Sequence, residues 1–359
     1  MKRLIAIAMT LTLSLSLLAS CGSTGSTPST QPSSAPSETA STAPESTAPA
    51  TGDVKTGLGI VSSLSESTEV TDGKGSEVAD ITAAAVTVDQ DGKIVKCVID
   101  SVRATVEFSD KGELLTPADT VFKSKNELKE DYGVKKASGI GKEWYEQAAS
   151  FAQYVTGKTV DEVKGIAVNE EGAPSDAELS SSVTVHVGDF ISAIDKAVAN
   201  AQDMGASAGD KLGLSIVSSA NQSAAATAES DGVAMVYSYF SVTTFGSDDK
   251  ITSCVIDAAQ NKLTFDTTGK ITSDIKAEQK SKNELGDDYG MKKASSIGKE
   301  WNEQAASFAQ YVTGKTVDEV KGIAVNDEGE ATDAELLSSV TIHITDFITL
   351  VEKAADSAK

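Results

Sequence analysis

The sequence contains one stretch twice, and this repetition limits the folds that the chain can adopt. Residues 140–169 and 297–326 are each thirty residues long and differ only at Tyr145 and Asn302. The correspondence runs without a gap from Cys97 in one copy and Cys254 in the other, at a constant offset (254 − 97 = 157). We therefore expect two tandem copies of one domain, at 55–203 and 210–359, each of ordinary size for a folding unit.

Runs of β-branched and apolar residues predict strands in each copy. In the first copy, Asp91 and Gly92 separate two such runs, and this pair is typical of a tight hairpin turn. The second copy follows the same order, so an antiparallel sheet is expected in both. The strands expected in the first copy are Ala84–Asp89, Ile94–Asp100, Ala104–Phe108 and Ser182–Val187.

Helices are expected in the second part of each copy. Apolar residues recur at helical spacing over Trp144–Val155. Thr159 and Glu162 have the spacing of a capping box, which predicts a short helix over 160–166. Asp189 is expected to cap a last helix. The predicted fold class is α+β, in which two tandem copies each pack an antiparallel β-sheet against helices on one face.

The N-terminus has the pattern of a bacterial lipoprotein signal peptide over residues 1–20. Lys2 and Arg3 precede an apolar stretch that is too short for a stable membrane span. The stretch ends in Leu18-Ala19-Ser20-Cys21, which resembles the lipobox at which such precursors are lipidated and cleaved. We expect Cys21 to carry the lipid and to anchor the protein on the extracytoplasmic face of the cell membrane.

Residues 21–54 are expected to form a disordered linker between the lipid and the domains. The segment consists mostly of Ser, Thr, Pro and Ala, has no aromatic residue and holds five of the seven prolines. Such a composition cannot form a core.

The acidic composition excludes one class of partner. The chain carries 31 Lys and Arg against 53 Asp and Glu, a net charge of −22. Removal of the signal peptide would take away Lys2 and Arg3, leaving −24 (29 − 53). Such a charge repels nucleic acid, so no nucleic-acid partner is expected.

Residues typical of catalysis or metal binding are few. His186 and His343 occupy equivalent positions, and the sequence offers neither a second histidine nor a suitable cysteine nearby, so no metal site is expected.

Cys97 and Cys254 have no partner within their own copies. They are expected to be buried free thiols, and a bridge between the two copies is the alternative. A nucleophile constellation is also missing, so we expect no enzyme.

The most informative candidate site is a loop and helix start that recur as KSKNELKEDYGVKKASGIGKEW (123–144) and KSKNELGDDYGMKKASSIGKEW (280–301). This block matches closely although the first strands differ, whereas loops normally vary more than cores. Cationic groups beside an aromatic ring suit a planar or anionic ligand. Two alternatives stay open: the tryptophans belong to the core, or recombination has homogenised the copies. The candidate ligand contacts are Tyr132, Lys135, Lys136, Ser138, Trp144, Tyr289, Lys292, Lys293, Ser295 and Trp301.

The order of elements resembles the FMN-binding domain of bacterial electron-transfer lipoproteins and of the Na⁺-pumping quinone reductase and Rnf complexes. The resemblance lies in the strand and turn of 86–94, in Gly139-Ile140-Gly141, and in a Ser-Ser-Val-Thr motif ahead of the last helix (181–184 and 338–341). It implies that FMN would be attached through phosphate to Thr184 and Thr341, and that the protein would carry electrons.

Two ligand-binding functions follow as hypotheses from these patterns, and a purely structural spacer, which needs no pocket, is a third possibility. The first is a non-enzymatic, membrane-anchored tandem binding module for a small molecule or a cell-envelope partner. The second is an extracellular electron carrier with FMN as its cofactor.

Overall fold

The computed structural model describes residues 53–359. The expected signal peptide, the lipidation site Cys21 and nearly all of the expected linker lie outside these residues. All described residues belong to one compact unit, which contains both copies of the repeat. We call residues 55–203 the first half and residues 210–359 the second half. Within the described part, no helix is long and apolar enough to span a membrane.

Each half is built on an antiparallel sheet, which confirms the expected α+β class. In the first sheet β3 pairs with β1, β2 and β4, and β1 also pairs with β6. In the second sheet the order is β5-β7-β8-β9. The strands of the first sheet are β1 (Lys55–Ser63), β2 (Thr68–Thr71), β3 (Lys74–Val88), β4 (Ile94–Ser109) and β6 (Gln202–Asp203). Those of the second are β5 (Val121–Phe122), β7 (Lys211–Ser219), β8 (Gly232–Phe245) and β9 (Ile251–Phe265).

The helices follow the same order in both halves. The first half has α1 (Lys125–Leu128), the 3₁₀-helix η1 (Lys129–Tyr132), α2 (Trp144–Val155), α3 (Val160–Lys164), α4 (Ala177–Ser180) and α5 (Gly188–Ala199). The second half has α6 (Lys282–Leu285), the 3₁₀-helix η2 (Gly286–Tyr289), α7 (Trp301–Val312), α8 (Val317–Lys321), α9 (Ala334–Leu337) and α10 (Thr345–Ser357). The expected apolar face of α2 is buried, and the capping box of Thr159 and Glu162 is present.

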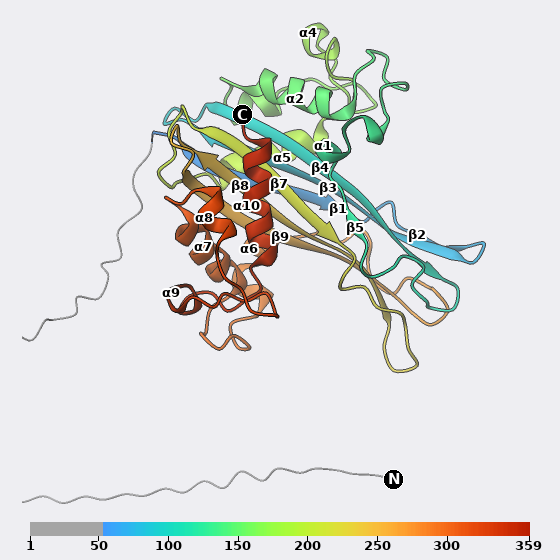
Figure 1. Cartoon of the computed structure of the whole chain (residues 1–359). Helices are drawn as coiled ribbons and strands as arrows, with labels where there is room; N and C mark the ends of the chain where they lie inside the picture. The colour runs from blue at the N-terminus through green and yellow to red at the C-terminus, as the bar shows by residue number, and fades with distance from the viewer. Residues whose placement is uncertain (1–52) are drawn as a thin grey trace, which may run out of the picture. The chain divides into compact units, whose positions relative to one another are not determined.

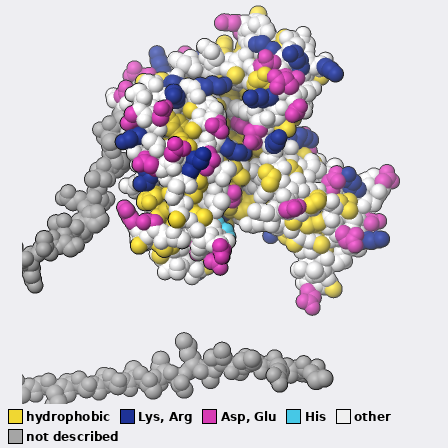
Figure 2. All heavy atoms as spheres, viewed as in Figure 1, with side chains coloured by type: hydrophobic (Ala, Val, Ile, Leu, Met, Phe, Trp, Pro, Cys, Tyr) yellow, Lys and Arg dark blue, Asp and Glu magenta, His cyan; other side chains and the backbone are white. Residues whose placement is uncertain are grey.

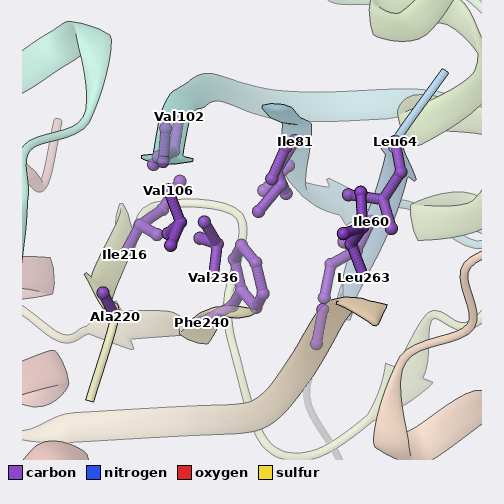
Figure 3. Close-up of a cluster of buried hydrophobic side chains, with 14 of the residues drawn as sticks. Ile60, Leu64, Ile81, Val102, Val106, Ile216, Ala220, Val236, Phe240 and Leu263 are labelled. Carbon is purple, nitrogen blue, oxygen red and sulfur yellow. The ribbon is translucent and has the colours of Figure 1, made fainter. Parts of the chain in front are cut away.

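The two sheets pack face to face, and helices cover their outer faces (Figure 1). Successive residues of a strand point to opposite faces of the sheet. On β3, Ala83 and Ala85 therefore face the second sheet, whereas Ala84 and Val86 face the helices of their own half. Figure 3 shows side chains of both halves, such as Val106 and Val236, meeting in the core between the sheets. This shared core gives the unit four layers.

The contacts between the halves are reciprocal. Phe108 stacks on its counterpart Phe265, with ring centroids 4.2 Å apart and planes within 7° of parallel. Lys353 pairs with Glu127 at 2.7 Å, and their counterparts Lys196 and Glu284 pair in the same way. Such an exchange of equivalent contacts is the signature of a two-fold related, isologous interface. The two halves of this chain therefore pack as two subunits of a symmetric dimer would.

Glycines on β1 and β7 let the last helix of each half approach its sheet closely. A Cβ added at Gly57 would lie 1.9 Å from the carbonyl oxygen of Ala197 on α5. The equivalent atom at Gly213 would lie 2.0 Å from the carbonyl oxygen of Ala354 on α10. Neither position can hold a side chain while the helix stays where it is. Neither β1 nor β7 was expected from the sequence, although each begins its half.

The structure corrects three expectations about local structure. Residues 182–187 form a loop, because the main-chain N–H groups of Thr184 and Val185 donate to the side chain of Gln147 and not to a neighbouring strand. The expected strand over 104–108 is the continuation of β4, which runs unbroken along β3. Asp189 does not cap α5, because the helix already begins at Gly188 and Val187 holds the cap position.

Candidate functional site

The recurring block places its aromatic candidates around a lysine that the sequence analysis did not select. The Lys125 Nζ lies 4.9 Å from the ring centroid of Tyr132 and 5.0 Å from that of Trp144. Trp144 is buried and packs edge-on against Phe190 of α5. Lys135 and Lys136 are exposed on the loop beyond η1. The loop thus brings Tyr132 and Trp144 together and leaves its lysine pair in solvent.

The equivalent lysine in the second half is enclosed in aromatic rings. The Lys282 Nζ lies 4.4 Å from the centroid of Tyr289, 4.6 Å from Trp301 and 4.8 Å from Tyr237, and it hydrogen-bonds the Tyr237 hydroxyl. Burial lowers the pKa of Lys282 to about 7, while the negative charge of Asp257 acts in the opposite direction. The Lys282 side chain therefore fills the space between these rings, and the two candidate lysines of this half, Lys292 and Lys293, are exposed.

A buried glutamine in each half connects the block to a second loop. The Gln147 Nε2 donates to the Ser138 hydroxyl at 3.2 Å and to the carbonyl oxygen of Lys142 at 3.1 Å. Its Oε1 accepts the main-chain N–H of Thr184 at 2.7 Å and of Val185 at 3.2 Å. Gln304 makes equivalent contacts with Ser295, Lys299 and Thr341. Each glutamine joins two loops through its amide, which is a structural reason for keeping both the glutamine and the loop serine.

The two threonines of the FMN resemblance belong to the same network. The Thr184 hydroxyl donates to Gln147 Oε1 at 3.2 Å, and the Thr341 hydroxyl donates to Gln304 Oε1 at 3.3 Å. The Thr184 residue is exposed on the loop ahead of α5, whereas Thr341 is half-buried ahead of α10. Neither threonine lines the groove described next.

A groove of about 990 Å³ lies between the halves, at the side where β4 and β7 are neighbours. One wall comes from the first half, through β4, α1, η1 and α2, and the other comes from the second half, through β7 and α10. The same side of the molecule is seen in Figure 2, where basic side chains lie among acidic ones. The sequence could not reveal this groove, because its two walls are far apart along the chain.

The groove gathers cations in an otherwise acidic protein. Of its lining lysines, Lys96 donates to the main-chain oxygen of Lys359 at 3.1 Å, and Lys353 is paired with Glu127. Lys123 and Lys129 are exposed, and within residues 53–359 neither forms an ion pair. The lining residues with ionisable side chains are Lys96, Asp100, Lys123, Glu127, Lys129, Tyr145, Lys353, Asp356, Lys359 and Cys97.

Three positions of the groove have lost this chemistry in the second half, whereas Lys123 is kept there as Lys280. Lys96 is replaced by Ser253, Lys129 by Gly286 and Tyr145 by Asn302. Tyr145 and Asn302 are the single difference in the thirty-residue block, and Tyr145 lines the groove. At the equivalent edge, Ser253 is fully buried and its hydroxyl hydrogen-bonds Thr56 at 2.7 Å. The two sides of the interface have therefore diverged at the residues that make the groove open and cationic.

Lys129 holds a backbone conformation that favours glycine. Its φ is 48° and its ψ is −117°, close to the values of its counterpart Gly286 (φ 50°, ψ −123°). A residue with a Cβ is strained there, and strain of about 1–3 kcal/mol is retained mainly where function requires it. The first half thus carries a lysine at a groove position for which glycine is the unstrained choice.

We expect Lys129→Gly to stabilise the protein by about 1 kcal/mol, because relief of strain exceeds the added entropy of the unfolded chain. The measurement is the free energy of unfolding in urea. The control is Lys123→Gly, at an exposed neighbour whose φ is not positive, where we expect a small loss. Equal effects of the two substitutions would show that Lys129 is unstrained.

Three buried carboxyl groups with a raised pKa, Glu77, Asp100 and Asp257, make the stability depend on pH. Burial raises the pKa of Asp100, which lines the groove, to about 6, although hydrogen bonds from Ser124 and from the N–H groups of Ser101 and Asn126 act in the opposite direction. Burial likewise raises the pKa of its counterpart Asp257 to about 6. The folded pKa exceeds the ordinary value of 3.8 for both aspartates. The stabilising contribution of each aspartate is therefore complete below pH 3.8 and is lost as the pH rises through about 6.

We expect the free energy of unfolding to increase as the pH falls from about 7 to about 5, before carboxylates with ordinary pKa values are protonated. Urea denaturation across this interval measures the slope. The double variant Asp100→Asn/Asp257→Asn, which cannot titrate at these positions, should show a flatter dependence. A slope that is the same in the variant would assign the effect to other groups.

No metal site is evident in the described part of the chain. Among residues 53–359, no cluster of three His, Cys, Asp or Glu side chains could hold an ion. Cys97 and Cys254 are both free, but only Cys254 is buried as expected, whereas Cys97 is half-buried at the edge of β4. They belong to different helix-facing cores, with the shared core between them. The bridge that the sequence left open is not formed in this structure.

Comparisons with known proteins identified no relative of this chain. No family model matches the chain, and neither a curated protein nor a solved structure matches it.

Proposed function

We propose that this protein is a lipid-anchored, extracytoplasmic binding protein that holds a small anionic ligand in the groove between its halves. The observation that carries the proposal is the one-sided divergence at the groove. Lys96, Lys129 and Tyr145 are present on one side of the interface, and serine, glycine and asparagine replace them on the other. The strained backbone of Lys129 supports the same conclusion.

The physical chemistry of the groove favours an anion. A volume of about 990 Å³ is within the range of sites that take small molecules. Two unpaired lysines at its rim give a local positive potential, and the net charge of −22 on the whole chain repels anions elsewhere. These two lysines therefore favour an anionic ligand in this groove.

The test is a calorimetric screen of small carboxylates, phosphates and sulfonates against the chain from residue 22 onward. The decisive variant is Lys96→Ser/Lys129→Gly/Tyr145→Asn, which gives the groove the residues of its counterpart. We expect at least a tenfold loss of affinity, because each lost charge contact contributes about 1 kcal/mol.

The matched control is Lys135→Gln/Lys136→Gln, which neutralises the exposed lysine pair outside the groove. We expect this variant to bind as the unmodified chain does. Loss of binding in the control alone would move the site to the recurring loop. Equal binding by all three proteins would refute a site in the groove.

The anchor is tested separately. We expect the full-length protein, produced in a bacterium, to be recovered with membranes and to incorporate labelled fatty acid. The Cys21→Ala variant should do neither. Incorporation of label by this variant would refute lipidation at Cys21.

FMN is a second candidate ligand, and the exposed position of Thr184 ahead of α5 favours it. Thr184 and Thr341 would hold the flavin covalently through its phosphate, and the redox chemistry would come from the flavin ring. Co-production with a flavin transferase, followed by intact mass and absorbance, tests this. An added mass of one or two FMN groups that disappears in Thr184→Ala/Thr341→Ala would support an electron carrier. An unmodified mass would refute covalent attachment.

A further inference from the structure

We propose that the anionic ligand of the groove is a short acidic peptide, which adds its main chain to the open edge of β4. The inference rests on the proposed function, because it concerns the same groove. It names the chemical class of the ligand: an extended segment with at least one peptide N–H and C=O, and with carboxylates that reach the lysines.

The outer edge of β4 lines the groove. Residues 95–100 of this strand are all lining residues, and within the described part of the chain β4 pairs only with β3. Alternate residues of an antiparallel strand direct their main-chain groups to the same edge. The Ile99 carbonyl oxygen points away from β3, because it accepts a hydrogen bond from the Asn126 side chain at 2.9 Å. The main-chain groups of Cys97 therefore point the same way, into the groove.

Only a short part of this strand edge lacks hydrogen-bond partners, and residues with partners mark both of its ends. At one end, the Ile94 N–H donates to the carbonyl oxygen of Lys158, and the Ile94 carbonyl oxygen accepts from the N–H of Gly157. At the other end, Asn126 binds Ile99. Between these ends, no hydrogen bond within residues 53–359 reaches the main chain of Cys97 from beyond the sheet. One N–H donor and one C=O acceptor are thus presented to the groove.

The facing edge of β7 is already occupied. Leu212 exchanges main-chain hydrogen bonds with Lys359, at 3.0 and 3.2 Å. Further along, the Leu214 N–H donates to the Ser357 hydroxyl at 3.2 Å, and the Lys353 ammonium donates to the Ile216 carbonyl oxygen. A ligand that forms main-chain hydrogen bonds in this groove therefore binds to β4.

The equivalent edge in the second half is closed. Cys254 and Ser253 are both fully buried, whereas Cys97 and Lys96 are partly exposed. A strand edge that is recessed between two walls and flanked by lysine is protected against aggregation and still accessible to a small partner. Strand addition of this kind is a known mode of peptide recognition, in which main-chain bonds give affinity and side-chain contacts give specificity.

The lysines of the groove favour acidic peptides over others. Lys96 is adjacent to Cys97 on the strand, and Lys123 and Lys129 line the same groove from the α1 and η1 region. At about 3.3 Å per residue, a peptide of roughly three residues spans the open edge. Acidic side chains or a terminal carboxylate on such a peptide would reach these lysines.

The first experiment compares three ligands that share their charge and differ in their main chain. Calorimetry would measure the affinity of the chain for N-acetyl-Glu-Ala-Glu-amide, for the analogue in which the central amide N–H is replaced by an ester oxygen, and for glutarate, each of which carries two carboxylates. We expect the peptide to bind about tenfold more tightly than the ester, because the ester cannot donate to the Cys97 carbonyl oxygen. We expect glutarate to bind more weakly still.

Two failures are distinguishable in this design. Equal affinity for the peptide and its ester would overturn strand addition, and the groove would remain a site for anions. Binding of none of the ligands, together with a negative screen of other anions, would overturn the proposed function itself.

The second experiment uses the repeat as an internal control. Amide hydrogen exchange followed by NMR reports on Cys97 and Cys254 in the same sample. With saturating peptide, we expect exchange of the Cys97 amide to slow at least tenfold, since its N–H becomes hydrogen-bonded, and exchange of the Cys254 amide to stay unchanged. An unchanged Cys97 amide in the bound protein would overturn the proposal.

Discussion

Gly213→Ala is expected to destabilise the protein by about 3 kcal/mol. The added Cβ would lie 2.0 Å from the carbonyl oxygen of Ala354, far inside contact distance. Relief requires α10 to move away from β7, and this opens the helix-facing core of the second half. Overpacking of a rigid core costs typically about 1–3 kcal/mol, and main-chain atoms on α10 cannot turn aside as a side chain can.

The measurement for this variant is the urea midpoint together with the far-ultraviolet circular dichroism. Gly57→Ala should behave in the same way, because its Cβ would lie 1.9 Å from the carbonyl oxygen of Ala197 on α5. Gly139→Ala is the control, since no atom lies within 4 Å of its added Cβ. A midpoint for Gly213→Ala equal to that of the control would show that α10 can move away from β7 at little cost.

Gln147→Leu is expected to cost about 4 kcal/mol. The leucine fills a similar volume but leaves the N–H groups of Thr184 and Val185 and the carbonyl oxygen of Lys142 without partners. The fully buried Gln147 amide forms these hydrogen bonds and one more to Ser138, and each contributes about 0.5–1.5 kcal/mol net. The loops on both sides of α2 should loosen together, because one side chain holds both.

Chemical denaturation and amide exchange would measure these two consequences. Gln153→Leu on the same helix is the control, because Gln153 is exposed and its side chain forms no hydrogen bond among the described residues. We expect less than about 0.5 kcal/mol there. If Gln147→Leu is no worse than Gln153→Leu, the loops are held by other contacts, and the glutamine is not the cause of the near identity of the block.

Local patterns in the sequence predicted the elements whose stability comes from near neighbours. The apolar stripe of α2, the hairpin of β3 and β4 and the capping box at Thr159 all depend on residues a few positions apart. The strand expected at 182–187 was wrong for the opposite reason. Its alternating pattern is compatible with a strand, but the partner of its main chain is Gln147, thirty-seven positions earlier (184 − 147 = 37).

In the candidate site, too, local features were predicted from the sequence and features formed by distant residues were not. The recurring block was recognised from sequence, and the structure places Tyr132 and Trp144 of that block around Lys125 and buries Trp144. The groove was not recognised, because its walls at β4 and α10 are about 250 residues apart. One signal in the sequence did point to it: Tyr145 and Asn302 are the single difference in a thirty-residue repeat.

The sequence by itself determined that the chain has two equivalent halves of α+β type, since repetition and periodicity are properties of the chain. The continuous apolar run Ala83–Val86 on β3 also had to be buried on both faces. Only the tertiary structure decided that the second face of each sheet is covered by the other half. The hydrophobic effect is non-directional. An apolar face of a sheet must therefore be shielded from water, but the effect does not specify which part of the chain shields it. The reciprocal packing of the halves supplies that partner, and it also forms the groove.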